Sequence, residues 1–166
     1  MPAVTVFGSG ADSLEEATWA DAVKLGQMLA FQGCEVVTGG YGGIMAAVSE
    51  GAAKIPGATI TGVLHLPPDE KPPNQFINNV IEAMDYQERM ATLLRVPSAI
   101  AFGGGSGTFA EVAVSIALLE RFPGRRLAIK TEAWKHDFFQ QIKHSNAVLW
   151  WRSVEDLYGW IESLHE

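Results

Sequence analysis

Cysteine is almost absent from this sequence, because Cys34 is the only one among 166 residues. An intrachain disulfide is therefore excluded, and so is a metal site built from thiolates alone. Cys34 comes just before a β-type run, and we interpret it as a buried or half-buried thiol. The histidines of the C-terminal part lack metal-ligand spacing, and no metal is expected. No cofactor is expected either. The histidines of the whole sequence are His65, His136, His144 and His165.

Basic residues and membrane signals are scarce as well. Lysine and arginine number 12 against 19 acidic residues, which gives a net charge of -7. This net negative charge disfavours binding to a nucleic acid or to an anionic membrane surface. Backbone amides can still bind one small anion. The opening segment "MPAVTVFGSG" lacks a basic region, and no apolar run approaches the length of a membrane span. We therefore expect a cytoplasmic protein with no nucleic-acid or membrane partner.

The chain does contain a regular alternation of short apolar runs and longer amphipathic segments. This alternation predicts an α/β fold, a single Rossmann-like domain over residues 1–166 with a parallel sheet and helices on both faces. The expected strands are Ala3–Phe7, Glu35–Thr38, Thr59–Leu64, Phe76–Glu82, Ser98–Phe102, Arg126–Lys130 and Ala147–Trp150. The expected helices are Leu14–Phe31, Ile44–Lys54, Asp85–Arg95, Thr108–Phe122, Trp134–Lys143 and Val154–Leu164.

Glycine clusters follow three of the expected strands, at Gly8–Gly10, Gly39–Gly43 and Gly103–Gly107. Ligands of parallel α/β sheets bind outside the carboxyl ends of the strands, so the three clusters predict one glycine-lined crevice. Each cluster leads toward a helix, whose first amides have no internal partner and attract anions. Any single cluster is also compatible with a simple tight turn. Together they favour a bound phosphate, with hydroxyls available from Ser9, Ser106 and Thr108.

Two common phosphate-binding motifs are incomplete. No lysine precedes Thr108, so the third cluster is not a Walker A loop. The spacing Gly8-Ser9-Gly10 is half of a dinucleotide fingerprint, and no acidic residue follows the second strand at the position that binds a ribose. A dehydrogenase is therefore the least favoured function.

Two charged residues lie near the expected crevice. Glu111 falls within the first turn of its helix if that helix begins at Thr108. It is either a capping-box residue or a functional carboxylate beside the bound phosphate. Arg89 is either part of a solvated helix face, paired with Glu88 or Asp85, or a cation for the ligand.

These motifs together resemble the LOG ("Lonely Guy") family of nucleotide-binding proteins. The family's Pro-Gly-Gly-x-Gly-Thr-x-x-Glu motif is matched at Gly103–Glu111, with Gly103 in place of the proline. A second motif is matched at Gly39–Met45, and "QERM" at Gln87–Met90 is similar to the segment that holds the family's arginine, with Met90 in place of its lysine.

The resemblance implies hydrolysis of the N-glycosidic bond of a nucleoside 5'-monophosphate, such as AMP or a cytokinin nucleotide, by a homodimer. Glu111 would stabilise the oxocarbenium-like transition state, and Arg89 would position the phosphate or the departing base. The implied binding residues are Gly8, Ser9, Gly40, Gly43, Met45, Gly104, Gly105, Ser106, Gly107 and Thr108. The sequence is also similar to a sister branch that includes a molybdenum-cofactor carrier protein, which implies a non-catalytic carrier or sensor as the alternative. Lysine decarboxylation is excluded, because no residue marks a pyridoxal-phosphate lysine.

Overall fold

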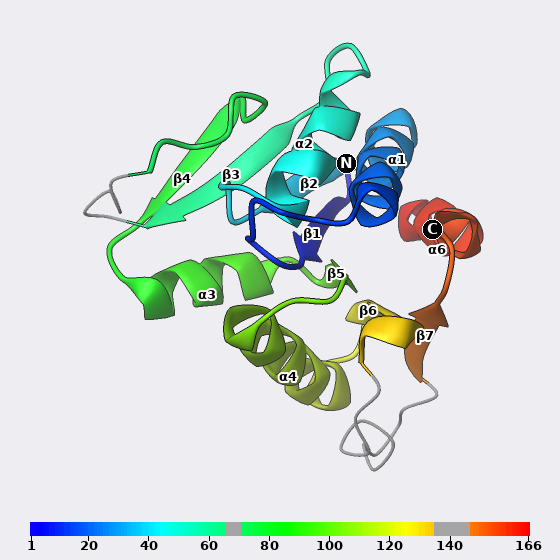
Figure 1. Cartoon of the computed structure of the whole chain (residues 1–166). Coiled ribbons are helices and arrows are strands. Elements are labelled where there is room, and N and C mark those ends of the chain that lie inside the picture. Colours follow the sequence, from blue (N-terminus) through cyan, green and yellow to red (C-terminus); the bar gives the residue numbers. More distant parts are fainter. Residues whose placement is uncertain (66–70, 135–146) are drawn as a thin grey trace.

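A seven-stranded, fully parallel sheet forms the centre of the protein (Figure 1). The computed structural model describes residues 1–65, 71–134 and 147–166. The strand order is β4-β3-β2-β1-β5-β6-β7. In chain order the strands are β1 (Ala3–Phe7), β2 (Glu35–Thr38), β3 (Ile60–His65), β4 (Asn79–Ala83), β5 (Ser98–Ala101), β6 (Arg126–Lys130) and β7 (Val148–Trp151).

Helices cover both faces of the sheet, which confirms the predicted α/β Rossmann-like fold (Figure 1). One face carries α1 (Glu16–Phe31), α2 (Ile44–Ala53) and α6 (Tyr158–Glu162), and the other carries α3 (Tyr86–Arg95) and α4 (Ser106–Arg121). Short 3-10 turns lie at Thr131–Ala133, Val154–Leu157 and Ser163–His165. Among the helices in the described ranges, none combines the length and the apolar character needed to cross a bilayer.

The alternation of side chains along β1 divides the core into two halves. Val4 and Val6 pack under α1 and α2, whereas Phe7 packs under α3 and α4. Thr5 also points to the second face, where its hydroxyl donates to the carbonyl of Leu93. Both faces of a central parallel strand are buried, which explains why the sequence of β1 is almost entirely apolar.

Several element boundaries differ from the sequence prediction. Helix α4 begins at Ser106 rather than Thr108, because Gly105 serves as its N-cap residue and the glycine-rich segment already adopts helical geometry. Strand β4 begins at Asn79 rather than Phe76, since the Asn78 side chain bonds to the backbone at the start of β3. The predicted closing helix is interrupted by 3-10 turns. Most of the predicted helix Trp134–Lys143 lies outside the described residues.

The two helices α1 and α2 pack with their backbones in close contact, side by side on one face of the sheet (Figure 1). A Cβ atom on Gly26 would overlap the carbonyl oxygen of Val48, and a Cβ on Gly51 would overlap that of Val23. Backbone oxygens cannot rotate away as a side chain can. The packing of this pair therefore requires glycine at both positions.

We predict that Gly26→Ala lowers the free energy of unfolding by about 2–3 kcal/mol, because α1 and α2 must separate to admit the methyl group. Urea-induced unfolding measures this difference. Gly159→Ala in α6 is the matched control, since its Cβ would meet no atom within 4 Å, and a stability equal to that of the wild type or up to about 1 kcal/mol higher is expected for it. Equal stabilities of the two variants would contradict this description of the α1–α2 packing.

Candidate ligand-binding site

The strand order reverses between β1 and β5, and the glycine loops meet at this point. Phe7 of β1 lies opposite Ala101 of β5, so the two strands end at the same level. Parallel sheets bind ligands in the crevice beyond such a reversal. The loop that follows β1 and the loop that follows β5 therefore emerge side by side.

Backbone hydrogen bonds join all three glycine loops. The amide of Ser9 donates to the carbonyl of Gly103 at 2.9 Å, and the amide of Ile44 donates to the carbonyl of Ser9, also at 2.9 Å. Gly43 has a φ of 62°, and a Cβ on it would overlap the Ser9 carbonyl oxygen. The predicted crevice is thus held together through the first loop, which is bonded to both of the others.

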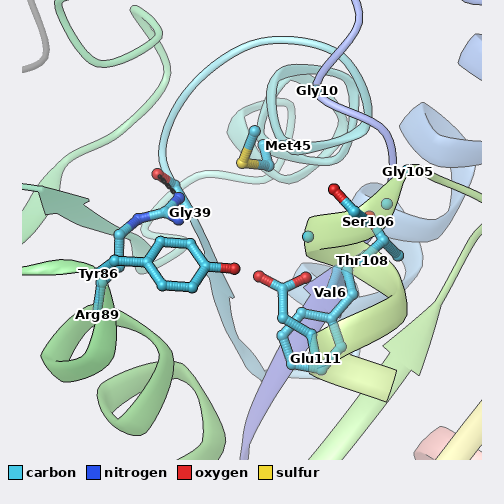
Figure 2. A pocket seen from close by; sticks show the side chains of 13 residues that line it. Val6, Gly10, Gly39, Met45, Tyr86, Arg89, Gly105, Ser106, Thr108 and Glu111 are labelled. Carbon is cyan, nitrogen blue, oxygen red and sulfur yellow. Dashed lines mark hydrogen bonds between the residues drawn. The ribbon is translucent and has the colours of Figure 1, made fainter. Parts of the chain in front are cut away.

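A cavity of about 300 Å³ opens between these loops, α3 and α4 (Figure 2). Its wall combines residues from β1, the three loops, α2, α3 and α4. They are Val6, Phe7, Gly8, Gly10, Gly39, Met45, Tyr86, Arg89, Gly105, Ser106, Gly107, Thr108 and Glu111.

The first turn of α4 forms one side of this cavity. The first intrahelical donor is the amide of Phe109, which bonds to the carbonyl of Gly105 at 2.9 Å. The amides of Ser106, Gly107 and Thr108 precede it, and the first amides of a helix have no acceptor within the helix. All three residues line the cavity. This side is therefore suited to an anion, because unsatisfied amides and the helix dipole act in the same direction.

Arg89 lines the opposite side of the cavity, but its guanidinium is anchored to the backbone. Its Nε donates to the Val63 carbonyl at 2.8 Å, and its Nη2 donates to the Gly39 carbonyl at 2.9 Å. The guanidinium carbon also lies 5.5 Å from the centre of the Tyr41 ring. The interpretation of Arg89 as a solvated residue paired with Glu88 or Asp85 is therefore wrong. It is a fixed positive charge at the rim of the second glycine loop.

Glu111 lies in the cavity between the amides of α4 and the guanidinium of Arg89 (Figure 2). Because α4 begins at Ser106 and has no side-chain cap, Glu111 lies beyond the first turn, and the capping-box interpretation is wrong. Burial raises the pKa of the Glu111 carboxyl from 4.5 to about 7, while the positive charge of Arg89 partly opposes this rise. The group can therefore exist in either protonation state near neutral pH.

Sequence reasoning missed Tyr86 as a residue of this cavity. Figure 2 shows its hydroxyl and the Glu111 carboxyl pointing toward each other from α3 and α4. The sequence does contain a usable signal, since Tyr86 precedes Arg89 by three residues and so shares its helix face. Gly39, which belongs to the second predicted glycine cluster but not to the implied binding residues, lines the same space.

The structure places the predicted binding residues in two groups. Those that line the cavity are Gly8, Met45, Gly105, Ser106, Gly107 and Thr108. The others, Ser9, Gly40, Gly43 and Gly104, are absent from its wall and shape the loops instead. For example, a Cβ on Gly104 would overlap the Thr108 hydroxyl, and Gly40 has a φ of 80°. Within the parts of the chain that the structure describes, no three His, Cys, Asp or Glu side chains gather as they would around a metal ion.

Comparison with known proteins places this geometry in a family. The model of the SLOG cluster4 family matches residues 1–157. An uncharacterized protein of Archaeoglobus fulgidus is 29% identical over 108 residues, which are 64% of this chain and 70% of that protein.

Solved structures resemble nearly the whole chain. The structural-genomics target TM1055 shares 26% identity at a TM-score of 0.80, over 98% of this chain and 99% of that one. The molybdenum cofactor binding protein from the phototrophic bacterium Rippkaea orientalis shares 25% identity at a TM-score of 0.80, over 99% of this chain and 98% of that one.

Proposed function

The chain belongs to the SLOG cluster4 family, and from that premise we propose that its crevice binds a phosphorylated small molecule of the nucleotide or pterin-cofactor class, as a carrier or sensor. The similar protein from Rippkaea orientalis binds the molybdenum cofactor. The ligand's phosphate would lie against the first turn of α4. The rest of the ligand would extend toward Tyr86, Arg89 and Met45, which line the far side of the cavity.

One observation supports this proposal most strongly: Ser106, Gly107 and Thr108, whose amides precede the first intrahelical donor, line a cavity to which two further glycine loops also contribute. Glycines let the backbone approach a phosphate more closely than any side chain would allow. Among the described residues that line the cavity none is a lysine, and Arg89 donates two hydrogen bonds to backbone carbonyls. Recognition of the anion would therefore depend mainly on the backbone.

A charge at the first residue of α4 tests the proposed phosphate position. A negatively charged side chain at the N-terminus of a helix interacts favourably with the helix dipole, so Ser106→Asp is expected to fold normally. Its carboxylate would occupy the phosphate position and repel a ligand anion, so we expect AMP affinity to fall at least about tenfold, as measured by isothermal titration calorimetry.

Ser106→Ala is the matched control, since it keeps the amides and removes only one hydroxyl. Its AMP affinity is expected to stay within about threefold of the wild type. Equal AMP affinities of wild type and Ser106→Asp would place the phosphate elsewhere, and an absence of binding to the wild type would contradict the proposal itself.

A second candidate function is hydrolysis of the N-glycosidic bond of a nucleoside 5'-monophosphate. The position of Glu111 favours it, because this carboxyl shares the cavity with the phosphate-binding amides and would lie beside a bound ribose. An ionised Glu111 would stabilise positive charge that develops on the sugar and would orient a water molecule. A pKa near 7 leaves a substantial ionised fraction at neutral pH.

For the hydrolase candidate, incubation with AMP and isopentenyl-adenosine monophosphate should release free base and ribose 5-phosphate, which chromatography detects. Because the candidate depends on an ionised Glu111, Glu111→Gln should lower the rate by at least about a hundredfold. The rate of the wild type should rise with pH through about 7. Binding of either nucleotide without base release would rule out this candidate and leave the carrier or sensor function.

We also propose that the chain forms a homodimer through the outer surfaces of α3 and α4. An apolar groove between these helices is lined by Gln87, Met90, Ala91, Leu94, Arg95, Val114, Leu118 and Arg125. Exposed apolar surface of this kind is typical of interfaces.

Introducing a charge into this groove tests the dimer. We expect sedimentation equilibrium to show a dimer for the wild type and a monomer for Val114→Glu, because burying an unpaired carboxylate in an apolar interface is unfavourable. Val114 is 37% exposed in the single chain, so the substitution should leave the fold intact. A monomeric wild type, or a dimeric Val114→Glu, would contradict the proposed interface.

A further inference from the structure

The ionisable side chains of the cavity are few, and their charges nearly cancel. Among the described residues that line it, the ionisable side chains are Tyr86 and Arg89 from α3 and Glu111 from α4. The wall residues from β1, the glycine loops and α2 carry no ionisable side chain. With Glu111 ionised, the side chains of the cavity sum to zero charge. With Glu111 neutral, they sum to one positive charge, which favours an anion.

Arg89 is poorly placed to neutralise Glu111. Its Nε and Nη2 already donate to the carbonyls of Val63 and Gly39. Within residues 1–65, 71–134 and 147–166, the ion pairs found are Lys24–Glu155 and Lys130–Asp21, and neither includes Arg89 or Glu111. The two charges therefore share the cavity without direct contact.

In the described part of the chain, burial and the charge of Arg89 are the causes that act on the pKa of the Glu111 carboxyl, and no hydrogen bond to a protein group is among them. Partial burial costs more free energy for an ionised carboxylate without a protein partner than for the protonated, neutral acid. Burial accordingly raises the pKa of this carboxyl to about 7. A phosphate dianion bound at the first turn of α4 would raise it further, because a like charge nearby disfavours ionisation.

We propose that Glu111 is protonated in the ligand complex and donates a hydrogen bond to an acceptor oxygen or nitrogen of the bound phosphate ester. This inference rests on the proposed binding function and specifies the ligand's chemistry. The ligand has a phosphate for the amides of α4 and, within reach of Glu111, an acceptor atom. The proton is taken from solvent when the dianion binds and returns to solvent when it leaves.

Ligand binding of this kind and hydrolysis require opposite protonation states of Glu111. Hydrolysis needs the ionised carboxylate, so its rate would rise with pH, whereas binding through the neutral acid weakens as pH rises. Figure 2 shows Tyr86 beside Glu111. Its hydroxyl can donate or accept, so it is compatible with either protonation state of Glu111. The direction of the pH dependence therefore identifies the form of Glu111 that the ligand meets.

Sulfate is the probe that tests the proposal, because it remains a dianion throughout the range in which Glu111 titrates. Its affinity for the full chain is measured by isothermal titration calorimetry at about pH 5.5, about pH 7 and about pH 8.5. For the wild type we expect affinity to fall about tenfold per unit above pH 7. Glu111→Gln carries a permanently neutral amide donor, so its affinity should not depend on pH. Glu120→Gln, at an exposed position of the same helix, should retain the pH profile of the wild type.

A ligand-free measurement gives a second test. The folded-state pKa of Glu111 is raised, so the folded state holds its proton longer than the unfolded state does. The free energy of unfolding of the wild type, relative to Glu111→Gln, should therefore fall between about pH 4.5 and about pH 7 and stay level above that. A constant difference across this range would overturn the proposal, because it would show that burial does not raise the pKa on which protonation in the complex depends.

The sulfate outcomes are distinguishable from a failure of the proposed function. A wild-type affinity that does not change with pH, or a parallel fall in wild type and Glu111→Gln, would overturn the role of Glu111 and leave the phosphate site standing. Absence of sulfate binding at every pH would overturn the phosphate site and this inference together.

Discussion

The backbone bonding of Ser9 is the constraint on which the rest of the site depends. Its amide and carbonyl join the first glycine loop to the third and to the start of α2. The loops can approach so closely because β1 and β5 end at the same level. A side chain on Gly43 would separate them, because it would overlap the Ser9 carbonyl. The glycines are therefore explained by contacts between loops as well as by the approach of a ligand.

Electrostatics then decide what this cavity can hold. The amides of α4 attract an anion from one side, and Arg89 contributes a fixed charge from the other. Glu111 lies between them, half-buried and with a pKa near 7. The described residues of the cavity wall include no lysine, so they offer little side-chain charge to offset a phosphate dianion. The protonation state of a single carboxyl is therefore enough to change its affinity for anions.

The sequence predicted the strands and the glycine crevice from local patterns. It left both Glu111 and Arg89 between a structural and a functional interpretation, and the structure places both in the cavity. The sequence could not predict that Arg89 is anchored, since the acceptors at Val63 and Gly39 are distant along the chain. The sequence prediction placed the start of α4 at Thr108, because a glycine-rich segment is typical of a loop. In the structure Gly105 is the N-cap residue and the helix begins at Ser106. Tyr86 was missed because its role depends on α3 facing α4 across the cavity.

The central claim is that the first turn of α4 binds the phosphate of a small molecule. A titration of the ¹⁵N-labelled protein with AMP, followed by amide chemical shifts, tests it most directly. We expect the amide signals of Ser106, Gly107 and Thr108 to shift in a saturable manner, because these N–H groups would donate to the phosphate. Saturable shifts elsewhere that leave these three amides unchanged, or no shifts at all, would contradict it.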